Sequence, residues 1–366
     1  MTAFLARLSA AWIIVLVALT APVPALAAAS IVIDVATGRV LSHENAFQRW
    51  YPASLTKLMT AYVAFRAVRA GEVTLKSPVV VSARAAKEPP SKMGYKPGSV
   101  LTLDDALKIL MVKSANDIAT AVGESLAGSE AAFAARMNAE ARRLGMSGTH
   151  FVNAHGLHNP NQYSTARDLG ILAATIRREF PEYAGYFSLE GIQTDKNLMR
   201  SHNLLLGRFD GADGMKTGFI CASGFNLVGS ATRRGRTLIA VVVGATSQQE
   251  RTEIAARLLS EGFQRSGRSG TPIGNLAPYG RNRDKAVNMR AAICSKEAQA
   301  ERWNERDPDG KLIVRSPYLR PMHREPRVVP VRLGGAVGPL PDIAAPARYA
   351  NVPIPTPRPE PDANGY

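Results

Sequence analysis

The chain has 366 residues, 46% of them hydrophobic, which is enough to bury the core of one large domain or two ordinary ones. Its 45 Lys and Arg outnumber 30 Asp and Glu, so the net charge is +15. That excess favours anionic neighbours such as membranes, acidic wall polymers or nucleic acid, or it forms a solvated basic surface. No recognition-helix, ribonucleoprotein or zinc-knuckle pattern is present, which argues against nucleic acid.

The N-terminus has the pattern of an export signal. Arg7 precedes an apolar run that Pro22 and Pro24 break, and small residues up to Ala27 offer a cleavage site. The run is short for a membrane-spanning helix, which needs about 20 apolar residues. We expect residues 1–27 to be a cleaved signal peptide rather than a retained anchor. The mature protein is then secreted across the inner membrane into the periplasm, soluble or peripherally attached.

Apolar segments alternate with turn signals over residues 28–265, as in a packed domain. The pattern predicts a β-hairpin over 30–46, a buried helix over 54–72 and two helical stretches within 102–129 that break near Ser114. An amphipathic helix over 130–146 and three strands within 211–246 follow. Helices around a sheet of mainly sequential strands indicate an α+β domain.

Composition changes near residue 266. Fifteen of the 24 prolines lie from Thr271 onward, and each proline lacks a backbone donor. We therefore predict that residues 266–366 form a basic, Pro-rich tail that is largely extended or disordered. Within it, residues 311–314 (KLIV) and 327–333 (RVVPVRL) are candidates for edge strands.

The segment Ser54-Leu55-Thr56-Lys57 carries the first chemical pattern. Residues three apart lie on one face of a helix, so Ser54 and Lys57 meet without tertiary help. A serine hydroxyl needs a base to become a nucleophile, and a lysine in apolar surroundings has the lowered pKa that a base needs. The alternative is a serine near a helix start and a lysine whose ammonium reaches water.

Two further patterns follow along the chain. In Ser114-Ala115-Asn116 the hydroxyl is suited to relay a proton and the amide to hold a peptide group; alternatively, either residue caps the next helix. In Lys216-Thr217-Gly218 a cation and a hydroxyl suit a carboxylate, and the glycine lets a bound peptide lie against the strand edge. The alternative is a basic strand start with a packing glycine.

The order SxxK, SxN and KTG is that of penicillin-binding proteins and class A β-lactamases. The chain resembles that superfamily over about residues 30–265, and most closely the low-molecular-mass D-alanyl-D-alanine carboxypeptidases. YPASLTKLMTAY (51–62) and HGLHNPNQYSTARD (155–168) are similar as well. The resemblance implies a β-lactamase/transpeptidase-like α+β fold, in which helices flank an antiparallel sheet and a helical subdomain adjoins it.

The resemblance also implies a reaction. Ser54 attacks the carbonyl between the two terminal D-alanines of a peptidoglycan stem peptide, Lys57 is the general base, and Ser114 relays a proton to the leaving D-alanine. β-Lactams are then covalent inhibitors of Ser54. Neither a cofactor nor a metal is implied, and His155 is expected to fix its loop rather than to catalyse.

Five residues are implied to bind the substrate. Asn116 positions the acyl portion, Lys216 holds the charge of the network, and Thr217 binds the terminal carboxylate. The backbone N–H groups of the nucleophile and of Phe219, the residue after Gly218, form the oxyanion hole.

Three points stay open in the sequence. Family members often carry an arginine before the KTG strand that binds the substrate carboxylate, and both Arg200 and His202 lie near that place. Cys221 and Cys294 either form a disulfide, which an oxidising compartment favours, or remain free thiols. The tail lacks the β-rich domain and amphipathic helix of many relatives, so we hypothesise an electrostatic contact with wall or membrane surfaces instead.

Three other functions compete with the carboxypeptidase. A β-lactamase needs fast deacylation, which a glutamate supports in class A enzymes, and no matching loop is recognisable. A D,D-endopeptidase cuts cross-links with the same groups. A non-catalytic wall-binding protein would not require the intact Ser54, Lys57 and Ser114.

Overall fold

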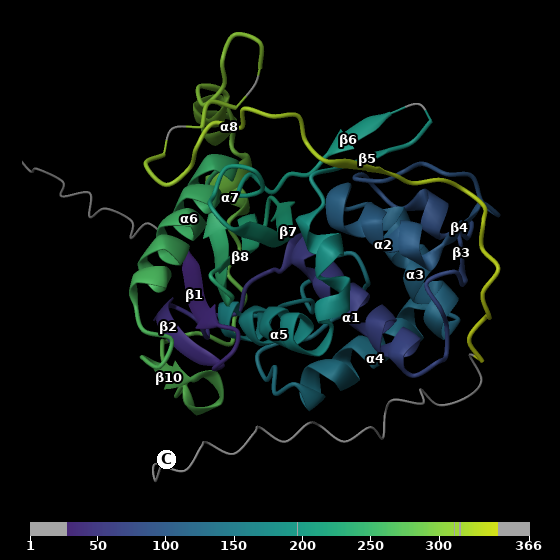
Figure 1. Cartoon of the computed structure of the whole chain (residues 1–366), viewed down its shortest axis with the longest axis horizontal. Helices are drawn as coiled ribbons and strands as arrows, with labels where there is room; N and C mark the ends of the chain where they lie inside the picture. Colours follow the sequence, from purple (N-terminus) through teal and green to yellow (C-terminus); the bar gives the residue numbers. More distant parts are fainter. Residues whose placement is uncertain (1–27, 196, 311, 315, 343–366) are drawn as a thin grey trace, which may run out of the picture.

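The computed structural model describes residues 28–195, 197–310, 312–314 and 316–342 (Figure 1). The predicted signal peptide and residues 343–366 lie outside these ranges. The elements, with short 3-10 turns labelled η, are β1 (Ala29–Asp34), β2 (Arg39–Glu44), η1 (Ala53–Leu55), α1 (Thr56–Arg69), β3 (Pro78–Val80), η2 (Ala85–Lys87), β4 (Val100–Thr102), α2 (Leu103–Val112), α3 (Asn116–Ala127), α4 (Glu130–Arg143), α5 (Ala166–Glu179), η3 (Pro181–Ser188), β5 (Gly191–Gln193), β6 (Leu198–Arg200), β7 (Ala212–Ile220), β8 (Gly224–Arg233), β9 (Arg236–Ala245), α6 (Gln248–Gln264), β10 (Thr271–Pro272), η4 (Ile273–Asn275), α7 (Arg290–Cys294), α8 (Lys296–Trp303) and β11 (Val328–Pro330).

One antiparallel sheet of six strands organises the domain, in the order β10-β2-β1-β9-β8-β7. The predicted hairpin over 30–46 is β1 and β2, and the three predicted strands of 211–246 are β7, β8 and β9. In β9 all residues from Leu238 to Ala245 are buried, as its apolar run indicates for an inner strand. β7 lies at the edge of the sheet, so one side of its backbone faces away from β8.

Helices cover both faces of the sheet (Figure 1). α6 packs on one face through an apolar stripe that includes Ala255 and Leu259, against Leu227 and Val242. α5 packs on the other face, against β1 and β9, and α1 lies beyond it. Twelve of the 14 residues of α1 are buried, which explains why apolar residues occur all round this helix.

The remaining helices form the helical subdomain. α3 packs between α2 and α4, and all three helices contact α1, with the short pair β3–β4 at their margin. α2 ends at Val112 and α3 begins at Asn116, so the predicted break near Ser114 is confirmed. The α+β class, with an antiparallel sheet and flanking helices, is confirmed too.

The tail differs in part from its prediction. Much of residues 266–342 has no regular structure, but α7 and α8 are helical, and β10 adds to β2 at the sheet edge. Residues 327–333 supply β11, which pairs with β5, whereas Leu312 of the KLIV run makes only an isolated bridge to Arg306. The tail runs along the body because side chains fix it there; Arg324, for example, donates to both carboxylate oxygens of Glu190.

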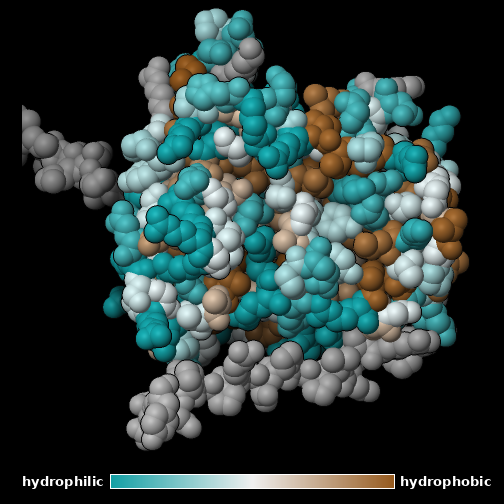
Figure 2. Space-filling model, in the orientation of Figure 1, coloured by the Kyte–Doolittle hydropathy of each residue, from teal (hydrophilic) through white to brown (hydrophobic). Residues whose placement is uncertain are grey.

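The surface around the tail is mixed. Figure 2 shows hydrophobic residues at the upper centre and right of this face, beside a mainly hydrophilic left side. Exposed apolar side chains on the tail and β6 include Leu198, Val328, Leu333, Val337 and Leu340. Among the residues described, no helix combines the length and hydrophobicity that crossing a bilayer requires.

Candidate active site

Ser54 and Lys57 meet at the start of the buried helix. Ser54 lies in the η1 turn and Lys57 in the first turn of α1, with Lys57 Nζ 3.0 Å from Ser54 Oγ. The side chain of Lys57 is 0% exposed. The alternative in which its ammonium reaches water is therefore wrong.

Two further acceptors surround the lysine. Lys57 Nζ donates to Asn116 Oδ1 at 2.8 Å and to the backbone oxygen of His155 at 2.7 Å. A neutral amine has two N–H groups and one lone pair, and these two oxygens can only accept. Once they take the two N–H groups, the lone pair points to the hydroxyl of Ser54. The arrangement thus orients Lys57 as a base toward the serine proton.

Electrostatics favour the neutral amine. Burial lowers the pKa of Lys57 well below its usual value, and the charge of Lys216 lowers it further, whereas Asp117 and Glu88 oppose the shift. Burial, helped by Arg251, also lowers the pKa of Lys216, to about 7. A base whose pKa lies closer to neutral pH is more often deprotonated and ready to accept a proton.

Ser114 occupies the turn between α2 and α3. Its φ of +62° lies in the left-handed region, which a serine rarely adopts. Its Oγ is buried and has no hydrogen-bond partner among the described residues. The N-cap of α3 is Ala115, without a side-chain cap, and the Asn116 amide instead donates to the backbone oxygen of Pro89. The helix-cap alternative is therefore wrong, and the hydroxyl remains available at the site.

The KTG segment lies on the edge strand β7, against the nucleophile's turn. A Cβ added to Gly218 would lie 3.1 Å from Ser54 N and 3.1 Å from the backbone oxygen of Pro52. Only a glycine lets the two backbones approach this closely. Lys216 is 1% exposed, and its Nζ donates to the backbone oxygen of Thr217. The simple alternative of a basic strand start does not explain this burial.

A pocket of about 360 Å³ joins these elements. Six residues predicted for the site line it: Ser54, Ser114, Asn116, Thr217, Gly218 and Phe219. Lys57 and Lys216 lie buried behind the lining. All eight predicted residues are thus gathered around one concave site, which is the usual form of a small-ligand site.

Sequence reasoning missed Arg251. This residue of α6 is buried, lines the pocket, and donates to the backbone oxygens of Gly218 at 3.3 Å and His202 at 3.1 Å. His202 also lines the pocket, while Arg200 is exposed and pairs with Glu325. The sequence does contain a signal for this residue. Arg251 precedes Ala255 by four residues, so it lies on the buried face of α6, where a charged side chain is unusual. Arg251 is thus a buried cation that faces the pocket.

The two cysteines form a disulfide. Cys221 and Cys294 are joined by an S–S bond, with their Cα atoms 5.6 Å apart. The Met289 N–H also donates to the backbone oxygen of Ala222. Since Cys221 and Ala222 lie in the turn between β7 and β8, these links fix the tail beside the pocket.

Comparison with known proteins identifies the family. The peptidase family of D-alanyl-D-alanine carboxypeptidases (Peptidase_S11) matches residues 17–247. D-alanyl-D-alanine carboxypeptidase DacC of Escherichia coli K12 is 37% identical over 245 residues, which cover 65% of this chain and 61% of DacC. DacD of Salmonella typhimurium is 38% identical over 245 residues, covering 65% of this chain and 63% of DacD. The chain belongs to the D-alanyl-D-alanine carboxypeptidase family.

Solved structures show the same fold. Penicillin-binding protein 6B from Escherichia coli is 38% identical, with a TM-score of 0.61 over 64% of this chain and 77% of that one. Penicillin-binding protein D2 from Listeria monocytogenes, in an ampicillin-bound form, is 33% identical, with a TM-score of 0.57 over 64% of this chain and 96% of that one. The penicillin-binding, transpeptidase-like fold is therefore confirmed. The chain spans slightly more than three-fifths of the length of DacC and DacD.

Proposed function

We propose that this protein is a serine-type carboxypeptidase that removes the terminal D-alanine from peptidoglycan stem pentapeptides through an acyl-enzyme on Ser54. One observation carries the proposal. The amine of Lys57 is buried and lies within hydrogen-bonding distance of two acceptors, Asn116 Oδ1 and the His155 carbonyl, and 3.0 Å from Ser54 Oγ. A neutral amine that donates to both acceptors directs its lone pair to the serine. Family membership supports the same reaction.

Acylation begins with a proton transfer. Lys57 takes the hydroxyl proton of Ser54 while Oγ bonds to the carbonyl carbon between the two D-alanines. The oxyanion that forms accepts hydrogen bonds from the backbone N–H groups of Ser54 in the η1 turn and of Phe219 in β7, two segments that Gly218 allows to lie close together. Removing one such donor typically slows catalysis 10²–10³-fold, which is about 2.7–4 kcal/mol.

The C–N bond then breaks. The proton held by Lys57 passes through Ser114 Oγ to the leaving nitrogen, so D-alanine departs as a neutral amine and Ser54 carries an ester. The otherwise unpartnered hydroxyl of Ser114 suits this relay. A water molecule afterwards attacks the ester and gives one proton to Lys57. Lys57 passes that proton to Ser54 Oγ as the ester C–O bond breaks, which releases the shortened peptide and restores the free serine.

Substrate orientation follows from the charges at the pocket. The terminal carboxylate binds Thr217 Oγ1 and lies near Arg251 and Lys216, and the acyl portion lies along the open edge of β7 against the Asn116 amide. β-Lactams present a strained amide and a carboxylate in the same positions. They therefore acylate Ser54 and inhibit the enzyme.

Labelling and turnover test the proposal together. A fluorescent penicillin should label the protein, mass mapping should place the adduct on Ser54, and Ser54→Ala should remove it. Monomeric pentapeptide muropeptides should lose D-alanine faster than cross-linked dimers are cleaved. No adduct on Ser54 would disprove the acyl-enzyme. Preferential cleavage of dimers would indicate an endopeptidase, and rapid nitrocefin turnover a β-lactamase.

We also propose that the chain is exported and that its tail contacts an anionic surface. The pattern of residues 1–27 supports export, and exposed Arg320 and Arg327 on the tail add to the net charge of +15. Cell fractionation with N-terminal sequencing should find a periplasmic protein that begins at Ala28. Binding to isolated sacculi or anionic vesicles should weaken with added salt; salt-independent binding would contradict the electrostatic contact.

A further inference from the structure

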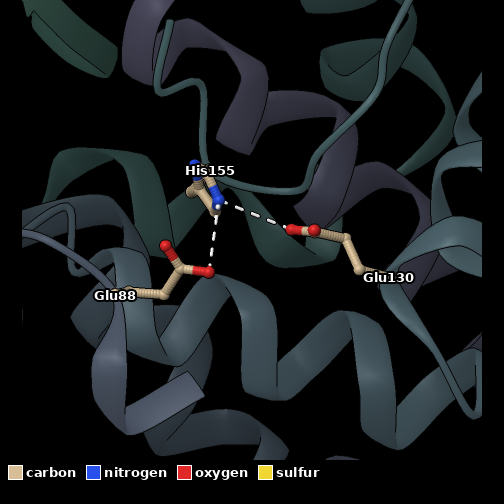
Figure 3. Close-up of side chains that lie close together, drawn as sticks. All are labelled: Glu88, Glu130 and His155. Carbon is tan, nitrogen blue, oxygen red and sulfur yellow. Dashed lines mark ion pairs between the residues drawn. The ribbon is translucent and has the colours of Figure 1, made fainter. Parts of the chain in front are cut away.

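A buried cluster of two carboxylates and a histidine lies behind the catalytic lysine. His155 Nε2 is 3.5 Å from Glu88 Oε1 and 3.4 Å from Glu130 Oε1 (Figure 3). Glu88 follows η2, Glu130 begins α4, and His155 lies in the loop before α5. The cluster therefore connects three segments that are far apart in the sequence. His155 is 4% exposed.

Hydrogen bonds define the tautomer of the imidazole. The backbone N–H of Leu157 donates to His155 Nδ1 at 3.0 Å, so Nδ1 carries no proton. The proton of the neutral ring is then on Nε2, directed at Glu88 and Glu130. The carboxylates have other donors: Thr120 Oγ1 donates to Glu88 at 3.0 Å.

The same residue touches the catalytic base. The backbone oxygen of His155 accepts from Lys57 Nζ at 2.7 Å. Next to it, Gly156 has a φ of +95°, and a Cβ there would lie 1.8 Å from the backbone oxygen of Ala53. The loop is thus pressed against the turn of the nucleophile, and a small rotation of the peptide after His155 would misdirect the lone pair of Lys57.

We propose that Glu88 and Glu130 hold the imidazole of His155 so that its backbone carbonyl orients Lys57 for proton transfer, which makes His155 a positioning residue. The inference rests on the proposed function. The imidazole fixes the residue from one side and the lysine binds its carbonyl on the other. Placement errors of about 1 Å can slow a reaction about 10²-fold, so anchoring this carbonyl has a measurable effect.

The charges around Lys57 and His155 determine how the acylation rate should depend on pH. Lys57 faces Lys216 from β7, Asp117 from α3, and Glu88, and the carboxylate of Glu88 raises the pKa of Lys57. Loss of the Glu88 charge therefore lowers the pKa of Lys57. Because the base must be neutral, the acid limb of the acylation profile then moves to lower pH.

Around the imidazole, Glu130 also pairs with Arg84, which lies 3.8 Å from Glu124. Burial raises the pKa of Glu130, but His155 and Arg84 together lower it by more, so the pKa lies below its usual value and this carboxylate stays charged.

A metal ion is the competing occupant. The three donor atoms lie within 4.8 Å of one another, and Zn²⁺ accepts such ligands. Coordination by Nε2 would require an unprotonated Nε2 while Nδ1 accepts from Leu157, and a neutral imidazole cannot supply that. The hydrogen bonds therefore favour an N–H donor over a metal ligand.

The test compares acylation rates of the full-length protein. Second-order rates of labelling by a fluorescent penicillin are measured from pH 5 to 10 for wild type, His155→Ala, His155→Gln and Glu88→Gln. His155→Ala should slow acylation about tenfold or more. His155→Gln should recover most of the rate, because its amide Nε2 can donate to both carboxylates. Glu88→Gln should move the acid limb to lower pH.

Glu124→Gln is the matched control, because it removes a carboxylate near Arg84 that does not contact His155. Its acylation rate and pH profile should equal those of wild type. Rates are normalised to the folded fraction from thermal melts. Variants of His155 and Glu88 that melt earlier but keep the wild-type rate and profile would reduce the cluster to a structural role and overturn the proposal. One bound equivalent of zinc, with activity lost on chelation, would overturn it as well. Absence of wild-type labelling would instead refute the acyl-enzyme itself.

Discussion

Replacing Lys216 with methionine should stabilise the protein while disabling it. The ammonium is buried, and the pKa falls from 10.5 to about 7 mainly because of desolvation. One pKa unit corresponds to 1.36 kcal/mol, so the folded state disfavours this charge by about 5 kcal/mol relative to the unfolded chain. Methionine has a similar length and no charge. The variant loses the hydrogen bond to Thr217, which contributes about 1 kcal/mol, and relaxation of the surrounding protein reduces the benefit further. We therefore expect the free energy of unfolding to rise by about 2 kcal/mol or more at pH 7.

The stability difference between Lys216→Met and wild type should depend on pH, and the direction of that dependence follows from the lowered pKa of Lys216. Below pH 7 the lysine is protonated in both states, and the folded state bears the full cost. Between pH 7 and 10.5 the folded protein releases the proton and the unfolded chain keeps it, so wild-type stability rises with pH. The advantage of Lys216→Met should therefore shrink between pH 7 and 9, by at most about 1.4 kcal/mol per pH unit.

Urea unfolding at pH 6, 7, 8 and 9 measures this difference. Lys96→Met, at an exposed position, is the control and should show no such trend. A Lys216→Met variant that is less stable than wild type at every pH, or a difference that does not change with pH, would refute the reasoning. Penicillin acylation of the variant should fall sharply, because the proposed reaction depends on the charge of this lysine.

Three further changes have defined outcomes. Gly218→Ala should slow penicillin acylation about tenfold or more, because its Cβ would lie 3.1 Å from Ser54 N and push β7 away; an unchanged stopped-flow rate would contradict this close approach. The double variant Cys221→Ser/Cys294→Ser should lower the free energy of unfolding by up to about 4 kcal/mol, because the disulfide joins residues 73 positions apart and restricts the unfolded chain. A wild-type melting temperature would show that this link to the tail adds no stability. Arg251→Gln should lower kcat/KM for pentapeptide about 10–100-fold through lost carboxylate binding, whereas equal turnover would assign that carboxylate to other groups.

The sequence by itself determined the local chemistry. Ser54 and Lys57 are three residues apart, and backbone geometry alone brings residues at this spacing to one face of a helix. The break at Ser114, the hairpin and the three-strand run of 211–246 also follow from local preferences and apolar periodicity. These features depend on interactions between residues close together in the sequence, so the rest of the chain has little influence on them.

Tertiary structure decided everything that joins distant segments. Asn116 and the carbonyl of His155 reach Lys57 across separations of 59 and 98 residues, and no local pattern specifies that distance. Arg251 enters the pocket only because α6 packs against β8 and β9, and the tail lies beside the pocket only because Cys294 bonds the β7–β8 turn. The lowered pKa of Lys57 also depends on the tertiary structure. Desolvation depends on what surrounds the amine, and only the folded chain supplies those surroundings.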